Sequence, residues 1–157
     1  MMKTKSFMLF ITALAFLSFA KAQNTNKDSA EVANTLKSLL VVCKNVDPGD
    51  PKTKSQGTFY KAAPYIVYQG PDKEKAWKTF SNYRNTEEKK GVDEICSRIN
   101  QTVNQDYDYR IIRYATEKES EGLWHVLIIS YMKNGVETKT AFAFLKIGKQ
   151  FGLGDID

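Results

Sequence analysis

The fold is decided by residues 123–147, which have the sequence LWHVLIISYMKNGVETKTAFAFLKI. The nearly continuous apolar run from Leu123 to Tyr131 is typical of a central strand with both faces covered. Asn134-Gly135 favours a tight type I′ turn, after which Thr138 to Ile147 returns as the antiparallel neighbour. This stretch therefore predicts a hairpin at the centre of a sheet.

Two further strands flank the hairpin. Residues 107–114 alternate between apolar and polar side chains, and the charged segment 116–122 predicts the turn that follows. Gly148-Lys149 predicts a second turn, which leads into a short last strand over 151–155. The carboxyl-terminal third is thus expected to be a four-stranded antiparallel meander.

Three helices are expected before this meander. The first begins at Asp28, where Asp28 and Glu31 resemble a capping box, and stops near Asn45. The second runs from Pro71 to about Arg84, and the third begins at about Thr86. A short strand over 65–68 lies between the first two. The order favours an α+β fold in which three helices pack on a curved, mainly antiparallel sheet, forming a cone that offers a ligand site.

The amino terminus has the pattern of a signal peptide. Lys3 and Lys5 precede an uncharged, mostly apolar run over 7–20, and Ala20-Lys21-Ala22 supplies small residues for cleavage. The run is shorter than the roughly 20 residues that span a bilayer, so no membrane span is expected. We expect an exported protein, periplasmic or secreted, with residues 1–22 removed and residues 23–157 forming one domain.

Charge and composition exclude several classes of function. The mature chain has 20 basic and 18 acidic residues, and these are interspersed rather than gathered into a basic stripe. Nucleic-acid binding is therefore not expected. Two cysteines are too few for a zinc site made of four thiolates, a single histidine excludes motifs that need two, and the carboxylate pairs supply too few ligands for calcium. No metal or cofactor is predicted.

The closing pattern of the chain resembles the nuclear transport factor two-like superfamily, which has a cystatin-like α+β cone. The segments that carry the resemblance are Gly122–Val126, Asn134-Gly135, Phe142–Lys146 and Phe151–Asp155. The resemblance implies a cone-shaped domain, and the family's enzymes place an Asp, His or Tyr inside the cone. The same fold hosts enzymes, carriers and pure interaction modules, so the resemblance alone selects no function.

The catalytic candidates are His125 and Asp155. His125 is the one side chain whose ordinary pKa lies near neutrality, which suits a general base. Asp155 ends the last predicted strand, from where it could reach the rim of a pocket. No partner for either residue is identifiable from the sequence, and a structural role is the favoured interpretation of His125.

The ligand-binding candidates are aromatic residues around the early strand and second helix: Tyr60, Tyr65, Tyr68, Trp77 and Tyr83. Such side chains could line the mouth of a cone and hold an apolar or amphipathic molecule by stacking. The alternative is that they form the core that any small domain requires.

The two cysteines lie on apolar helix stripes that should face one core. In an oxidising compartment Cys43 and Cys96 would form a disulfide, and the alternative is a pair of buried thiols.

Three functions remain open from the sequence. The favoured one is an exported non-catalytic domain that binds a small apolar or amphipathic ligand, or a protein partner, in or around the cone. The second is a small lyase or isomerase of the ketosteroid-isomerase type that uses His125 or Asp155. The third is a homodimer formed through the outer sheet face, on which Ile129 and Tyr131 are expected to lie.

Overall fold

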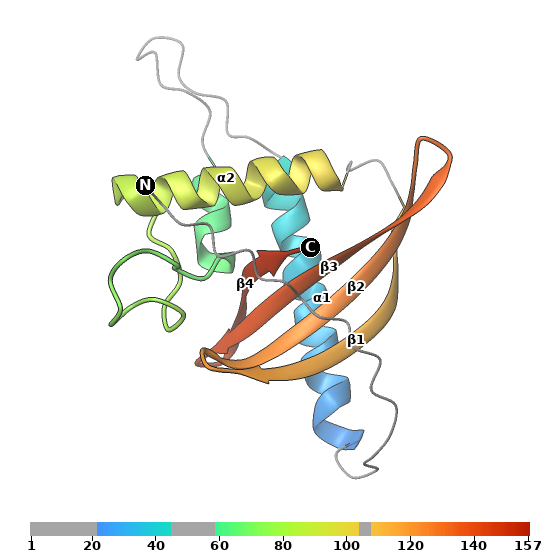
Figure 1. Ribbon diagram of the computed structural model, residues 1–157, viewed down its shortest axis with the longest axis horizontal. Coiled ribbons are helices and arrows are strands. Elements are labelled where there is room, and N and C mark those ends of the chain that lie inside the picture. Colours follow the sequence, from blue (N-terminus) through green and yellow to red (C-terminus); the bar gives the residue numbers. More distant parts are fainter. Residues whose placement is uncertain (1–21, 45–58, 104–107) are drawn as a thin grey trace.

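A four-stranded sheet and two long helices make up the computed structural model of the chain, which describes residues 22–44, 59–103 and 108–157 (Figure 1). The elements are α1 (Ala22–Lys44), the 3-10 helix η1 (Tyr60–Tyr65), α2 (Thr86–Thr102), β1 (Arg110–Glu119), β2 (Gly122–Lys133), β3 (Val136–Ile147) and β4 (Gln150–Ile156). The strands pair antiparallel in the order β1-β2-β3-β4. The predicted α+β class and antiparallel meander are confirmed, whereas the predicted signal peptide lies outside the described residues except for Ala22.

α1 buries one face and begins earlier than predicted. Val32, Leu36, Leu39 and Cys43 recur at helical spacing and are fully buried. The expected start at Asp28 is wrong, because no helix breaker precedes it and its carboxylate binds Lys146 of β3 at 2.8 Å instead of capping the helix.

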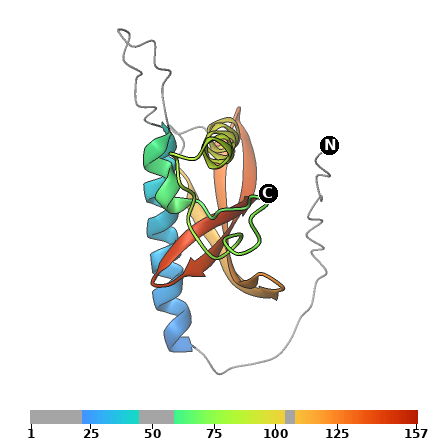
Figure 2. The same cartoon turned by 90° about the vertical axis from the view of Figure 1, so that its left-hand side faces the viewer.

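α2 begins where the sequence predicted. The side chain of Asn85 accepts hydrogen bonds from the backbone N–H groups of Glu87 and Glu88, at 3.0 and 3.3 Å. Both carboxylates lie in the first turn, where the helix dipole favours negative charge. The buried face of α2 packs near α1, and Figure 2 shows α1 along one side of the molecule with the strands on the other.

The predicted helix over 71–84 is wrong. The segment 66–80 folds back on itself instead: the N–H of Tyr68 donates to the carbonyl of Thr79, and the N–H of Trp77 donates to the carbonyl of Tyr68, both at 2.9 Å. Trp77 has φ of +66°, which no helical residue adopts. Only single bridges form in the early strand, Ile66 with Leu153 and Val67 with Phe80. The second of the three predicted helices is therefore absent from the described residues.

The hairpin between β2 and β3 follows its turn residues. Asn134 and Gly135 have φ of +52° and +79°, as a type I′ turn requires, so the predicted hairpin is confirmed. β1 is longer than predicted, because the charged residues 116–119 pair with 122–125 of β2 instead of forming a turn. The charged side chains do not prevent this pairing, because a strand at the margin of a sheet exposes most of its side chains to solvent.

The two faces of the sheet have different neighbours. Leu127, Ile129 and Tyr131 of β2 belong to the main core with α1 and α2, and we call this the helix face. Trp124 and Val126 point the opposite way, to what we call the outer face. The expectation that Ile129 and Tyr131 lie on the outer face is wrong: they are 0% and 3% exposed, and the Tyr131 hydroxyl donates to the carbonyl of Thr102 in α2.

Candidate functional site

His125 lies on the helix face of β2 and is buried. Its ring is 2% exposed and meets the ring of Phe151 edge-on, with centroids 4.8 Å apart. Nδ1 lies 2.6 Å from the hydroxyl of Tyr114, in a hydrogen bond. Because β1 and β2 pair with Tyr114 opposite Leu127 and Thr116 opposite His125, Tyr114 reaches the imidazole diagonally across the ladder.

An ion pair stands next to this histidine. Asp28 of α1 and Lys146 of β3 are 2.8 Å apart, and the Lys146 ammonium lies 5.0 Å from the centroid of Phe151. The hydrogen bond from Lys146 lowers the pKa of Asp28. Burial lowers the pKa of His125, with Asp28 opposing this effect and Lys146 adding to it. Burial also raises the pKa of Tyr114, as does the negative charge of Asp28.

This geometry keeps His125 neutral and enclosed. A pKa below the ordinary 6.5 leaves the imidazole uncharged at neutral pH. Its Nδ1 is engaged by Tyr114, and a ring that is 2% exposed offers no atom to a substrate in solution. The sequence singled out His125 but not Tyr114, Asp28 or Lys146, since only the strand register and the position of α1 bring these residues together.

Asp155 is engaged elsewhere. Its carboxylate lies 3.6 Å from the guanidinium of Arg98 in α2, and it accepts a hydrogen bond from the backbone N–H of Ile156 at 2.8 Å. Arg98 also donates to the carbonyl of Ile156. These contacts attach β4 to α2 and assign Asp155 to a structural ion pair rather than to a site shared with His125.

The five aromatic candidates do not line one cavity. Tyr60 is 46% exposed, and Tyr65 packs against the main core. Tyr68 is buried, and its hydroxyl accepts from the N–H of Asp72. Trp77 covers Trp124 on the outer face. These side chains therefore lie in different parts of the fold and do not form the predicted stacking site.

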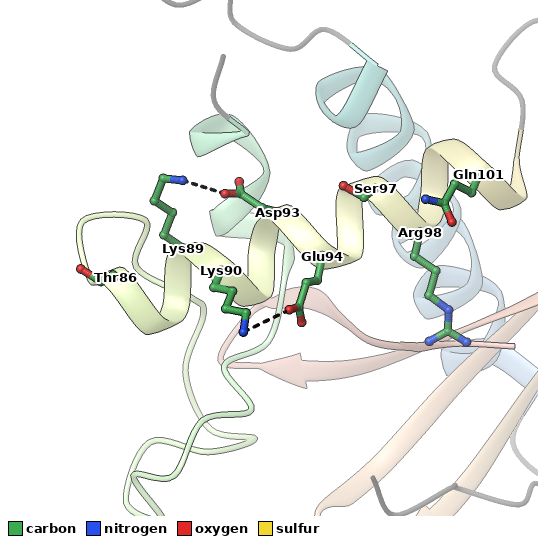
Figure 3. Close-up of a pocket in the computed structure, with 8 residues that line it drawn as sticks. All are labelled: Thr86, Lys89, Lys90, Asp93, Glu94, Ser97, Arg98 and Gln101. Carbon is green, nitrogen blue, oxygen red and sulfur yellow. Dashed lines mark hydrogen bonds and ion pairs between the residues drawn. The ribbon is translucent and has the colours of Figure 1, made fainter. Parts of the chain in front are cut away.

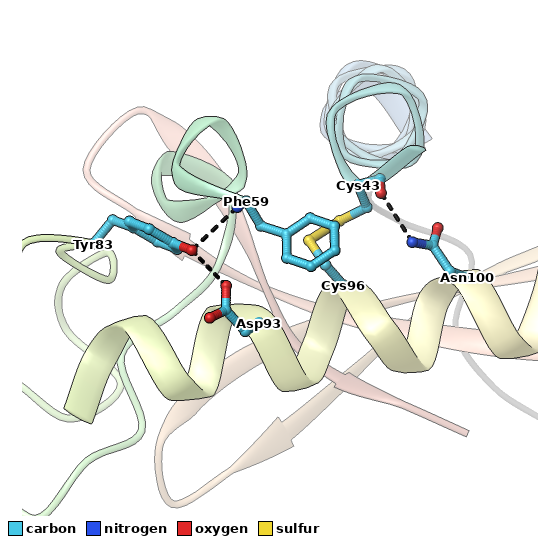
Figure 4. Close-up of a disulfide and its surroundings, with 6 residues drawn as sticks. All are labelled: Cys43, Phe59, Tyr83, Asp93, Cys96 and Asn100. Carbon is cyan, nitrogen blue, oxygen red and sulfur yellow. Dashed lines mark hydrogen bonds between the residues drawn. A yellow bond between two sulfur atoms is a disulfide. The ribbon is translucent and has the colours of Figure 1, made fainter. Parts of the chain in front are cut away.

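Tyr83 joins three segments of the fold, as Figure 4 shows. Its hydroxyl donates to Asp93 of α2 at 2.6 Å and accepts from the backbone N–H of Phe59 at 3.1 Å. Burial and the hydrogen bond to Asp93 raise the pKa of Tyr83. The Lys89 ammonium lies 5.2 Å from the ring centroid and binds Asp93 at 2.7 Å. These contacts connect α2 to the segment that precedes η1.

A shallow depression of about 500 Å³ runs along α2 (Figure 3). It is lined by Thr86, Lys89, Lys90, Asp93, Glu94, Ser97, Arg98 and Gln101. Lys90 pairs with Glu94 at 3.8 Å, as Lys89 does with Asp93. The charges of these two pairs neutralise each other along the helix, so the depression does not present a field of one sign.

Cys43 of α1 and Cys96 of α2 form a disulfide, with Cα atoms 5.0 Å apart. Both residues are fully buried, and Figure 4 shows the Phe59 ring beside the sulfur atoms. The side-chain amide of Asn100 donates to the carbonyl of Cys43 at 2.9 Å, which adds a second connection between the helices. The cysteines therefore tie α1 to α2 and carry no free thiol.

On the outer face, Trp124 lies under Trp77 and carries a buried indole Nε1 that has no hydrogen-bond partner among the described residues. No cluster of three or more possible metal-ligating side chains occurs within the described ranges. The helices of the described chain include none with the length and apolar character of a membrane span. Comparisons with known protein families, characterised proteins and solved structures found no match for this chain.

Proposed function

We propose that the protein is an exported, non-catalytic interaction domain that binds a protein partner through its surface. The observation that carries this proposal is the packing between helices and sheet. Leu127, Ile129, Phe142 and Phe144 are fully buried there, and His125 is 2% exposed. The volume that a conical ligand pocket would occupy is filled by side chains, so we place the binding surface outside it.

Apolar side chains on the surface support the same proposal. Ile111 and Ile112 of β1 are 46% and 42% exposed, and Met132 and Val136 flank the tip of the β2–β3 hairpin at 52% and 65%. These residues lie at one end of the sheet, and exposed apolar side chains of this kind are available for contact with a protein partner.

Export is the second part of the proposal. It is supported by the signal-peptide pattern of residues 1–22, which would leave a mature chain of residues 23–157. The disulfide between Cys43 and Cys96 agrees with an oxidising compartment, periplasmic or extracellular. We further propose kinship with the nuclear transport factor two-like superfamily, supported by the closing sequence pattern and by a helix-then-meander order of elements.

Native mass spectrometry of the protein purified from its exported compartment tests both parts. We expect a chain that begins at Gln23, is lighter than its reduced form by two hydrogens, and travels with a second polypeptide. A cytoplasmic form made without residues 1–22 is the matched control and should retain free thiols. A small-molecule mass that disappears on denaturation would replace the surface proposal with a ligand-binding one, and a chain that keeps residues 1–22 would contradict export.

A further inference from the structure

The two margins of the sheet differ in what covers them. At the β4 margin, Ile66 pairs with Leu153 in parallel orientation, and the N–H of Val67 donates to the carbonyl of Leu153 at 2.9 Å. At the other margin, β1 pairs with β2 alone, and no described segment adds a strand beyond it. Figure 1 shows β1 along the side of the sheet farthest from η1.

The open strand has no proline, and its charged side chains, which usually oppose strand addition, are of both signs. β1 has the sequence RIIRYATEKE, without proline or glycine, and its one irregularity is a bulge between Ile111 and Arg113. From Arg113 to Glu119 the ladder is regular, so this part of β1 presents a straight row of backbone donors and acceptors on its free side.

Charge is distributed unevenly along β1. Its first half carries Arg110 and Arg113, and its second half, which is net acidic, carries Glu117, Lys118 and Glu119. Arg110 is occupied by Glu137 at 2.8 Å, whereas Arg113 and Glu117 make no ion pair within the described part of the chain. A strand that is basic in one half and acidic in the other is complementary to an antiparallel copy of itself.

We propose that β1 pairs antiparallel with β1 of a second copy, which joins the two sheets into one of eight strands. The inference rests on the proposed function and names its partner as a copy of this chain. A two-fold axis perpendicular to the joined sheet relates the copies and keeps every side chain on its own face, so the residue at the axis must face itself.

Among the central residues, Ala115 fits this axis. With Ala115 at the centre, Arg113 lies opposite Glu117 of the second copy and Glu117 lies opposite the second copy's Arg113. All four belong to the outer face, because Arg113 pairs with Ile128 and Glu117 pairs with Trp124 in β2. The exposed Ile112 belongs to the bulge that precedes this regular stretch, and in this register it lies next to Lys118 of the second copy, whose aliphatic stem can cover it.

The neighbouring registers fit less well. An axis at Tyr114 sets Arg110 opposite Lys118, which are like charges. An axis at Thr116 also sets opposite charges against each other, Arg113 against Glu119, but it moves both isoleucines of β1 beyond the paired stretch, because the strand ends at Glu119. Only the Ala115 register pairs opposite charges and also covers Ile112.

Sedimentation equilibrium with reciprocal charge reversals tests the inference. The mature, disulfide-bonded chain is expected to dimerise at protein concentrations up to about 500 μM, which are high enough to detect a weak interface. Arg113→Glu alone and Glu117→Arg alone each set like charges opposite each other at both symmetry-related positions. Each should weaken the dimer at least about tenfold.

Mixing the two single variants is the decisive measurement. The Arg113→Glu chain then contributes two acidic side chains, and the Glu117→Arg chain contributes two basic ones. Every cross-strand pair therefore has opposite charges, and a heterodimer is expected to form with the affinity of the wild-type dimer. Mixing Arg113→Glu with Glu119→Arg is the register control, and it should not restore the dimer. Lys149→Glu, in the turn at the opposite margin, is the charge-matched control and should dimerise as the wild type does.

Two results would overturn the inference: a wild-type monomer at the highest concentration, or a dimer that neither single reversal weakens. Far-ultraviolet circular dichroism shows that each variant is folded, and recovery in the mixture excludes misfolding as the cause of dissociation. A monomeric wild type that still travels with a different polypeptide in the native mass spectrum would reject the β1 dimer and leave the proposed interaction function standing.

Discussion

The ring of Trp77 lies edge-on against the ring of Trp124, with centroids 5.5 Å apart and planes at 69°. Trp77 reaches this position from a backbone at φ +66°, a conformation that is costly for any residue except glycine. The contact closes the second hydrophobic cluster, which contains Val67 and Leu145. The outer face of the sheet is therefore covered at the β4 end by the segment 66–80 rather than by a helix.

Replacing Trp77 should expose Trp124 and destabilise the fold. Trp77→Ala is expected to lower the free energy of unfolding by about 2 kcal/mol, because an aromatic contact and the burial of both rings are lost. Urea titration measures the loss, and the fluorescence of Trp124 should shift to the red. Trp77→Gly should be the more stable of the two variants, since glycine relieves the positive φ. Leu123→Ala, at a residue that is 50% exposed, is the control and should change little.

Alanine substitutions at two glycine positions should change the free energy of unfolding in opposite directions. A Cβ at Gly154 would lie 2.6 Å from the Trp124 ring, whereas a Cβ at Gly91 in α2 would meet nothing within 4 Å. Gly154→Ala is expected to destabilise by about 1–3 kcal/mol through overpacking. Gly91→Ala should stabilise by up to about 1 kcal/mol through helix propensity. Thermal unfolding of both variants checks the pair, and equal effects would contradict the packing of Trp124 on β4.

Removing the disulfide should cost more than any of these substitutions. Cys43 and Cys96 are 53 positions apart, and the loop-entropy relation gives about 4 kcal/mol for a closed loop of that size. The double variant Cys43→Ala/Cys96→Ala is expected to lose between about 2 and 5 kcal/mol in urea. Reducing agent should destabilise the wild type to a similar extent and leave the double variant unchanged. A wild type that is insensitive to reduction would show that the bond contributes nothing.

Acid should weaken the protein through His125 in a defined range. Burial lowers the pKa of the folded imidazole below 6.5, so the unfolded chain takes up a proton first as the pH falls. Stability is complete above the unfolded pKa and declines as the pH falls from about 7 toward 5, with a slope of at most about 1.4 kcal/mol per pH unit. The carboxyls of Asp28 and Glu137 have ordinary pKa values of 3.8 and 4.5, and the fold lowers both. The stability that they contribute is therefore lost at a lower pH than the contribution of His125.

His125→Gln is the variant that isolates this effect. Its free energy of unfolding, measured in urea at half-unit steps from pH 7.5 to 5, should show a flatter slope than the wild type, whatever its absolute stability. Tyr114→Phe keeps the titrating imidazole and should keep a slope. Parallel wild-type and His125→Gln curves would assign the acid sensitivity to other groups.

Two elements of the fold rest on local chemistry and are predictable from the order of the residues alone. The spacing of Val92, Cys96 and Ile99 is sufficient to predict α2, because helical hydrogen bonds join residues four apart. Asn134-Gly135 likewise specifies the hairpin, since its backbone preferences are intrinsic to the two residues.

The remaining features depend on partners that are distant in the chain, so they follow from tertiary packing and not from local sequence. Tyr68 and Trp77 form a backbone hydrogen bond with each other, although an apolar helical spacing was present at 71–84. A shift of one residue in register would exchange the faces of β2, and register alone placed Ile129 and Tyr131 against the helices. His125 became an enclosed neutral group only when Tyr114 of β1 and the Asp28–Lys146 ion pair assembled around it, since burial and charge are properties of the folded neighbourhood rather than of the residue.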